Sequence, residues 1–235
     1  YRPEVAVVTN VQADHLDHYG SFEGVVRGFE RFAATIRPGG ALVACADDAG
    51  SAALAAVTAA GGTRVVSYGE CEAADVRLLD VTTSPTGTAF ELVHRGRRAG
   101  RVQLRVPGRH NALNATAAIT AAVELGVALP EAVAGVEAFT GTRRRFEARG
   151  QAGGVRVFDD YAHNPSKVAA AVATGRQAAG QGRLVVVFQP HLFSRTRDFA
   201  KQFGEALGGA DEVVVMDVYA AREDPELGVS GAPVA

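Results

Sequence analysis

The run Ala41–Ala46 (ALVACA) decides the interpretation of the first half of the chain, because six small or apolar residues in succession are typical of a β-strand. Two further β-branched runs and two stretches with apolar residues at helical spacing alternate with it. The expected strands are Val5–Thr9 and Arg64–Tyr68, and the expected helices are Phe22–Ile36 and Ser51–Ala60. This β-α-β-α-β order predicts a parallel sheet covered by helices.

The pattern changes between residues 75 and 106. Strand-like runs are separated there by turn-forming segments at 84–87 and 95–100, which predicts an antiparallel patch beside the parallel sheet. The expected strands are Val76–Val81, Thr88–His94 and Arg101–Val106, and the helices expected after them are His110–Leu125 and Pro130–Phe139.

A second alternation of strands and helices begins near Arg145 and predicts a Rossmann-like domain. Its expected strands are Val155–Asp159, Arg183–Phe188 and Glu212–Met216, and its expected helices are Pro165–Ala179 and Thr196–Leu207. Residues 141–144 have the composition of a linker, so we expect two α/β domains, at 1–142 and 143–235. The chain starts at Tyr1 and shows no clear closing element after residue 228, so we expect it to be the middle of a longer protein.

Composition narrows the function classes. The 235 residues carry a net charge of −2 and are 47% hydrophobic, which is ordinary for a soluble globular protein and gives no reason to expect binding to bulk nucleic acid or to an anionic membrane. Cys45 and Cys71 lie far apart, in no metal-ligand spacing. No apolar run of about 20 residues and no signal peptide is visible, so the cytoplasm is the expected compartment.

Polar clusters follow several expected strands, which is where ligands bind in parallel sheets. In the first cluster, at 9–18, two aspartates and two histidines fall within five residues and could hold a divalent cation. A polar loop with a helix cap explains the same residues, and spacing alone favours that simpler interpretation.

The second cluster is Gly108–Asn114 (GRHNALN). Asn111 and Asn114 are three residues apart near the start of an expected helix, so both amides lie on one face. An amide offers one donor side and one acceptor side, which suits the edge of an adenine, and a helix N-terminus favours nearby phosphate. Helix capping by the asparagines is the alternative, although asparagine is a poor residue inside a helix.

Three later clusters are also rich in polar side chains. The arginines of Gly141–Glu147 could reach a phosphate or could form a solvated basic linker. Phe158–Pro165 places adjacent acids between a strand and a helix, where a capping role is the alternative. Gln189–Asp198 carries His191 and two arginines that could bind a carboxylate, or that could simply pair with Asp198 and Glu205 on the surface.

A phosphate-binding loop of the form Gly-x-x-x-x-Gly-Lys-Ser/Thr is absent from the sequence. If ATP is used, the loop that holds its phosphates must lie outside these residues. We therefore expect this stretch on its own to be inactive.

Taken together, the clusters resemble the Mur ligase family over nearly the whole chain and in the same order. The motifs that carry the resemblance are Ala13–Asp17 (ADHLD), Gly108–Ala115 (GRHNALNA), Arg144–Glu147 (RRFE), Asp159–Pro165 (DDYAHNP), Gln189–His191 (QPH) and Ser194–Asp198 (SRTRD). Within the family, they are most similar to those of ligases that join L-alanine to UDP-N-acetylmuramate. The resemblance implies an α/β fold with the later part of a central ATP-binding domain and the start of a C-terminal domain.

The resemblance also implies a reaction and residue roles. ATP, with Mg²⁺, would convert the muramate carboxylate into an acyl phosphate that the amine of L-alanine attacks, in the synthesis of peptidoglycan precursors. Catalytic roles are implied for His15, Arg145 and Asp160, of which His15 would bind Mg²⁺ and Arg145 would face the nucleotide phosphates. The remaining implied roles are adenine contact for Asn111 and Asn114, ribose proximity for Tyr161 and His163, and contact with alanine or the muramyl carboxylate for His191 and Arg195.

Two positions depart from the family pattern. Asn164 stands where a second histidine is usual, which puts a ribose-side contact in doubt, and Arg143 stands where glycine is usual, which implies a stiffer hinge. Two alternatives for the function stay open. One is another ligase of the same type, acting on a muramyl tripeptide or resembling folylpolyglutamate or cyanophycin synthetases. The other is a non-catalytic module that binds an adenine nucleotide.

Overall fold

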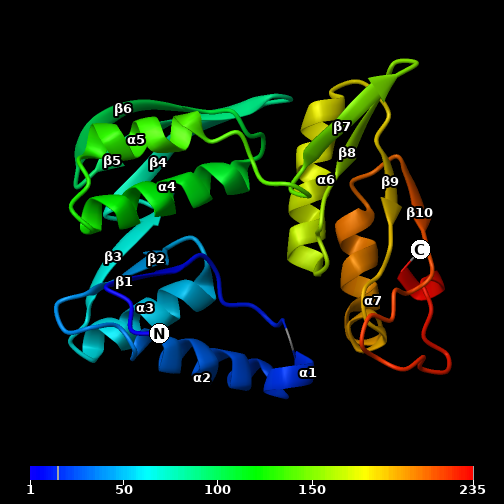
Figure 1. Cartoon of the computed structure of the whole chain (residues 1–235), viewed down its shortest axis with the longest axis horizontal. Coiled ribbons are helices and arrows are strands. Elements are labelled where there is room, and N and C mark those ends of the chain that lie inside the picture. Colours follow the sequence, from blue (N-terminus) through cyan, green and yellow to red (C-terminus); the bar gives the residue numbers. More distant parts are fainter. Residues whose placement is uncertain (15, 235) are drawn as a thin grey trace. The chain divides into compact units, whose positions relative to one another are not determined.

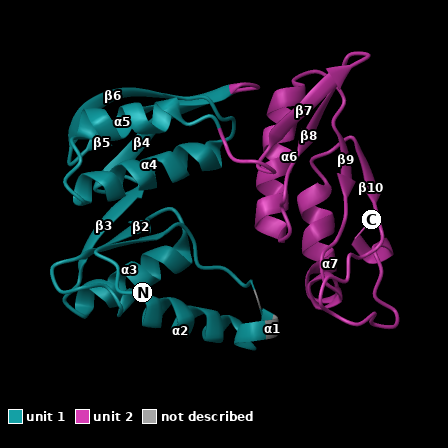
Figure 2. Ribbon diagram, viewed as in Figure 1, with its two compact units in different colours: residues 1–83, 87–140 teal, residues 84–86, 141–235 magenta. Residues whose placement is uncertain are grey.

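The computed structural model describes residues 1–14 and 16–234, the side chain of residue 17 excepted. The chain divides into two compact units, which Figure 2 shows in different colours. Unit 1 comprises Tyr1–Thr83 and Gly87–Thr140, and unit 2 comprises Ser84–Thr86 and Gly141–Ala235. Each unit is described by itself below.

A six-stranded sheet forms the centre of unit 1, with its strands in sequence order (Figure 1). The strands are β1 (Val5–Val8), β2 (Ala41–Cys45), β3 (Arg64–Gly69), β4 (Val76–Ser84), β5 (Gly87–His94) and β6 (Arg97–Leu104). The pairs from β1 to β4 are parallel and the β5–β6 pair is antiparallel. The parallel sheet and the antiparallel patch are both confirmed, and the patch is a continuation of the same sheet.

Helices cover both faces of this sheet. They are α1 (Leu16–Tyr19), α2 (Phe22–Ala33), α3 (Ala49–Ala60), α4 (Arg109–Glu124) and α5 (Leu129–Ala138). Along β2, Leu42 and Ala44 pack in one core cluster with residues of α2 and α3, while Val43 and Cys45 pack in another with residues of α4. Because both faces of β2 are buried, its sequence is uniformly apolar, and each large side chain contributes about 1.5–3 kcal/mol by leaving water.

Unit 2 is smaller and contains two separate two-stranded sheets. Its elements are β7 (Glu147–Ala152), β8 (Val155–Asp159), α6 (Pro165–Ala179), β9 (Val185–Phe188), α7 (Phe193–Leu207), β10 (Glu212–Val215) and the 3₁₀ helix η1 (Ala232–Val234). β9 and β10 pair in parallel and β7 and β8 pair antiparallel. The core beneath β9 joins residues of α6 and α7 around Phe188 and Phe203.

The α/β class and all the predicted strands and helices are confirmed, with boundaries shifted by a few residues. β6 starts at Arg97 rather than Arg101, because Arg95 and Gly96 both have positive φ (49° and 75°) and form a two-residue hairpin turn. β7 was not predicted, since its sequence EARGQA has no apolar alternation, and it is the described partner of β8. The short elements α1 and η1 were also not predicted.

One face of the β9–β10 pair carries three exposed valines beside Glu212. Val187 and Val214 are paired in register and are 64% and 47% exposed, and Val185 on the same face is 44% exposed. The alternate residues Val186 and Val213 pack against the core of unit 2. No helix within the described part of the chain has both the length and the apolar character needed to cross a membrane.

Candidate functional site

The loop after β1 leads to the predicted metal ligand, His15. This residue lies outside the described residues, so its predicted role as a metal ligand stays a prediction. The part of the loop before it is firmly held. The Asp48 carboxylate accepts hydrogen bonds from the N–H groups of Val11 (3.0 Å) and Ser51 (2.7 Å), and Ser51 Oγ donates to Val8 O. Among the described residues, which leave out residue 15 and the side chain of residue 17, no three His, Cys, Asp or Glu side chains form a group that could hold a metal.

The start of α4 carries the two predicted adenine contacts. The helix follows Gly108, whose φ is +103°, and receives no side-chain cap, so the alternative that the asparagines cap it is wrong. Instead, Asn111 Nδ2 donates to Pro107 O (2.7 Å), which fixes the turn before the helix. Asn114 lies one turn later and is exposed. The sequence Gly108–Asn114 therefore forms a rigid turn followed by an accessible amide.

In unit 2, the segment before β7 presents Arg145 between two residues in left-handed conformations. Arg144 and Phe146 have φ values of +57° and +46°, which are unusual for residues other than glycine. Arg144 N–H donates to a carboxylate oxygen of Glu147 (2.8 Å), and Arg144 O accepts the N–H of Tyr161 (2.9 Å). The hydrogen bond from Arg144 N–H lowers the pKa of the Glu147 carboxyl. The segment is thus a defined turn rather than a loose basic linker.

Asp160 and Tyr161 brace this turn from the end of β8. Asp160 Oδ2 accepts the N–H of Phe146 (2.8 Å). The Arg144 guanidinium lies 4.6 Å from the centre of the Tyr161 ring and 3.8 Å from an Asp159 oxygen. The backbone on both sides of Arg145 is therefore held by its neighbours' contacts, and Arg145 itself is exposed.

The start of α6 accounts for one departure from the family pattern. Asn164 is only 9% exposed, and its Oδ1 accepts the N–H of Lys167 (3.0 Å), so it caps the helix as the alternative interpretation expected. His163 Nδ1 lies 2.9 Å from Tyr161 O. A carbonyl oxygen only accepts, so Nδ1 carries the proton, and Nε2, 3.5 Å from Lys167 Nζ, faces the ammonium.

His191 lies between β9 and α7, within a row of rings. Its ring centre is 6.4 Å from that of His163 and 5.6 Å from that of Tyr219. Its Nδ1 is buried and has no hydrogen-bond partner among the residues that the structure describes. Burial lowers the pKa of His191, and the positive charges of Arg195 and Arg222 lower it further, whereas Glu223 opposes them.

The two arginines of α7 have different environments. Arg195 is 7% exposed, so the surface alternative is wrong for it. Arg197 is exposed and pairs with Asp198 (2.9 Å) and Glu226 (2.8 Å), so for this residue the surface alternative holds. Glu205, also considered as a partner, lies 3.9 Å from Lys201 instead.

Sequence reasoning missed the loop that follows β10. Tyr219 contacts His191, Arg222 acts on its pKa, and Glu223 binds the start of α7 through Ser194. The signal was present, because these residues follow the carboxyl end of a predicted strand, where the other clusters were found. With them, one end of unit 2 combines imidazole, guanidinium and phenol groups, a set suited to binding a carboxylate or phosphate.

Comparison with known proteins gives a consistent assignment. The Mur ligase middle domain model matches residues 1–122, and the model named Mur ligase, glutamate ligase domain, matches residues 144–234. The UDP-N-acetylmuramate–L-alanine ligases of Kineococcus radiotolerans and Paenarthrobacter aurescens are 55% and 53% identical, over 100% and 98% of this chain and 50% of each relative. The chain thus spans about half the length of these curated relatives.

Solved structures agree with this assignment. The UDP-N-acetylmuramate–alanine ligase of Thermotoga maritima matches with a TM-score of 0.73 and 30% identity, over 93% of this chain and 47% of that one. The MurF ligase of Acinetobacter baumannii matches with a TM-score of 0.78 and 26% identity, over 92% and 47%. The chain belongs to the Mur ligase family.

Proposed function

We propose that this chain is part of an ATP-dependent ligase that joins L-alanine to UDP-N-acetylmuramate, in the synthesis of peptidoglycan precursors in the cytoplasm. The observation that carries the proposal is the set of His191, Arg195 and Tyr219 at one end of unit 2. A half-buried imidazole with an unpartnered nitrogen lies there beside buried Arg195, an arrangement suited to an amino acid carboxylate. The names of the relatives support alanine as the substrate.

The two domains are proposed as 1–142 and 143–235, and each would contribute contacts of its own to a nucleotide. Asn111 and Asn114 would contact the adenine, and Tyr161 and His163 the ribose. Arg145 would neutralise charge on the phosphates, because it is exposed within a defined turn. Asp160 would act on the same step by fixing that turn. Positioning and charge neutralisation are the main contributions that a protein makes to phosphoryl transfer.

The chemistry requires an activated carboxylate. Transfer of the ATP γ-phosphoryl group to the muramate carboxylate gives an acyl phosphate, whose phosphate leaves when the alanine amine attacks the carbonyl carbon. His191 and Arg195 would hold the alanine carboxylate so that the amine faces this carbon, which lowers the entropic part of the barrier. Arg145 would stabilise the negative charge that develops on the phosphoryl oxygens.

We also propose Mg²⁺ as the metal, with His15 as a ligand. The donors in the segment 14–18 are imidazole and carboxylate groups, which suit a divalent cation. The rigid attachment of Val11 to Asp48 would present the segment after β1 at the edge of the sheet. When bound, the metal would neutralise charge on the nucleotide phosphates.

The test is a turnover assay of the complete protein with ATP, UDP-N-acetylmuramate and a panel of amino acids and a tripeptide. We expect amide formation with L-alanine and stoichiometric release of phosphate. Arg195→Lys should raise KM for alanine about tenfold, because lysine keeps the positive charge but cannot make the bidentate hydrogen bonds of a guanidinium to a carboxylate. Arg197→Lys, a matched change on the same helix, should stay within about twofold.

Two results would contradict the proposal. Preference for the tripeptide over alanine would indicate another ligase of the family. Nucleotide binding without amide formation, whatever the acceptor, would indicate a non-catalytic binding module.

A further inference from the structure

Helix α7 begins without a cap of its own. The residue in the capping position is Leu192, which has no polar side chain and adopts a φ of +73°. This conformation is strained for a leucine. Its side chain is 1% exposed, so the residue is buried in a backbone geometry that its neighbours must enforce.

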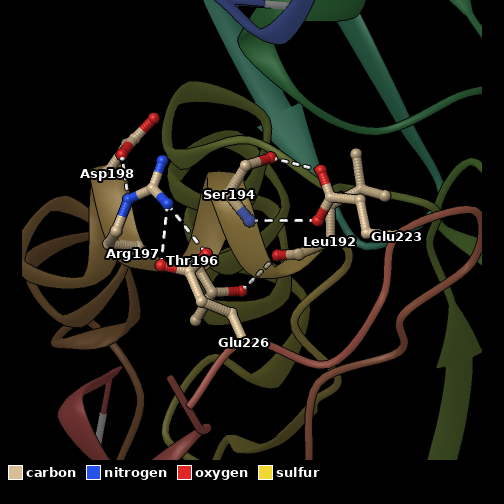
Figure 3. A network of polar contacts seen from close by, with 7 residues as sticks. All are labelled: Leu192, Ser194, Thr196, Arg197, Asp198, Glu223 and Glu226. Atoms are coloured by element: carbon tan, nitrogen blue, oxygen red, sulfur yellow. Dashed lines mark hydrogen bonds and ion pairs between the residues drawn. The ribbon is translucent and has the colours of Figure 1, made fainter. Parts of the chain in front are cut away.

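The missing cap comes from the loop after β10, 29 residues further along the chain. One oxygen of Glu223 accepts the N–H of Ser194 (3.0 Å), which is the second residue of α7, and the other oxygen accepts the Ser194 hydroxyl (Figure 3). A capping side chain normally makes this contact from the residue that immediately precedes the helix. The negative charge also lies at the positive end of the helix dipole.

The loop and the start of α7 are joined by backbone contacts too. Leu192 N–H donates to Tyr219 O (2.9 Å), and Tyr219 N–H donates to Pro190 O (2.8 Å). Thr196 Oγ1 donates to Leu192 O (2.7 Å), which closes the first turn. His191 therefore lies between Tyr219, which its ring contacts, and the first turn of α7, which follows it directly in the chain.

A kink interrupts α7 after its first six residues. Phe199 departs from helical geometry, with φ of −127° and ψ of 15°. The residues before it, including Arg195, form a short helical segment whose start is bound by Glu223 of the loop. Glu223 joins the loop to this segment at Ser194, and Tyr219 joins it at Leu192.

We propose that Glu223 is a positioning residue: by capping α7 from the loop after β10, it sets His191 and Arg195 in the orientation that binds the carboxylate of the amino acid substrate. This inference rests on the proposed function. Glu223 reaches the substrate through these residues and takes no part in the bond-making step. Its loss should therefore weaken amino acid binding while leaving the other substrates and the chemical step largely unchanged.

The chain offers a matched control in the same loop. Glu226 accepts two hydrogen bonds from Arg197 NH1 (2.9 and 2.8 Å), so it also joins the loop to α7 (Figure 3). However, that pair is partly exposed to solvent, with 51% and 40% of the side chains exposed. A contact of this kind contributes little.

The experiment compares Glu223→Ala, Glu223→Gln and Glu226→Ala in the complete protein, with alanine, ATP and UDP-N-acetylmuramate each varied. We expect Glu223→Ala to raise KM for alanine by roughly fivefold or more, with kcat and the other KM values within about twofold. Glu223→Gln, which keeps one acceptor oxygen, should fall between this variant and the wild type. Glu226→Ala should behave as the wild type. An unchanged KM for alanine in Glu223→Ala, or an equal loss for all three substrates, overturns the proposal.

Hydrogen exchange distinguishes this failure from failure of the proposed function. In the complete protein, the amide of Ser194 should exchange faster in Glu223→Ala than in the wild type, and Glu226→Ala should leave it unchanged. If the amide of Ser194 exchanges faster in Glu223→Ala but the wild-type protein forms no amide product, Glu223 does cap α7. In that case both its positioning role and the proposed function are refuted. Unchanged exchange in an active ligase would refute the positioning role alone.

Discussion

The carboxylate of Asp160 accepts a hydrogen bond of 2.8 Å from the backbone N–H of Phe146, fourteen residues earlier in the chain. Phe146 is one of two left-handed residues that flank Arg145. The contact therefore links an acid that sequence resemblance places among the catalytic residues to the backbone that presents an arginine. A carboxylate in this arrangement acts on the shape of the turn.

The first prediction separates the charge of Asp160 from its acceptor role. Asp160→Asn keeps an oxygen that can accept from Phe146 N–H, whereas Asp160→Ala leaves this N–H without its partner. In the complete ligase we expect kcat/KM for ATP to fall about tenfold or more in the alanine variant and much less in the asparagine variant. Asp159→Ala, which removes only an exposed ion pair with Arg144, is the control. An equal loss in both Asp160 variants would show that the charge itself is required.

A second prediction concerns the two asparagines of α4. Asn114 is exposed and Asn111 holds the turn before the helix through Pro107 O. Asn114→Ala should raise KM for ATP about fivefold without lowering the melting temperature, because alanine favours the helix more than asparagine does. Asn111→Ala should raise KM and also destabilise unit 1 by about 1 kcal/mol, measured by denaturant unfolding. A drop in stability for Asn114→Ala of the same size would contradict the distinction.

The third prediction follows from the environment of His191. Burial, with the charges of Arg195 and Arg222, lowers its pKa below the ordinary value of 6.5. The unfolded chain therefore binds this proton more readily than the folded chain. The stability that neutral His191 contributes is present above pH 6.5 and is lost as the pH falls from 6.5 toward the folded pKa.

Melting curves from about pH 7.5 to about pH 5.5 test this expectation. The melting temperature of His191→Gln should decrease less on acidification than that of the wild type. His94 provides a comparison in unit 1, because burial lowers its pKa as well. His94→Gln should reduce the same acid sensitivity separately. A wild-type profile that His191→Gln leaves unchanged would refute the role assigned to this group.

The fourth prediction uses two glycines inside helices. A Cβ at Gly50 in α3 would lie 2.4 Å from Val11 O, whereas a Cβ at Gly135 in α5 would have nothing within 4 Å. Gly50→Ala should destabilise the protein by about 1–3 kcal/mol, because backbone must move. Gly135→Ala should stabilise it by about 0.5–1 kcal/mol, because alanine favours the helix. Chemical denaturation of both variants measures the sign of each change in the free energy of unfolding. A Gly50→Ala variant as stable as the wild type would show that the loop after β1 can shift freely.

Local signals in the sequence were enough for most of the fold. Runs such as ALVACA and the helical spacing after Phe22 predict their elements because burial on one or two faces dictates residue type directly. β7 was not predictable in this way, because most of its residues are exposed and impose no alternation. Its existence depends on pairing with β8, which is a tertiary contact.

In the candidate site, too, local sequence patterns predict some features, while others depend on tertiary contacts. The position of polar residues after strands identifies His191 and Arg195, and the alternative of a helix cap at Asn164 is confirmed. The Glu223–Ser194 contact spans 29 residues and joins a loop to the start of α7, so no local pattern contains it. The left-handed conformation of Leu192 was equally unpredictable, because leucine disfavours it and only the surrounding hydrogen bonds hold it there.

The valine face of β9 and β10 sets a limit on how the chain behaves in concentrated solution. Val187 and Val214 lie side by side with about half or more of each side chain in water. Exposed apolar side chains that lie next to one another favour self-association, so we expect colloidal stability to decline with concentration. Val187→Thr would keep the β-branched shape that the strand favours while making that surface more polar.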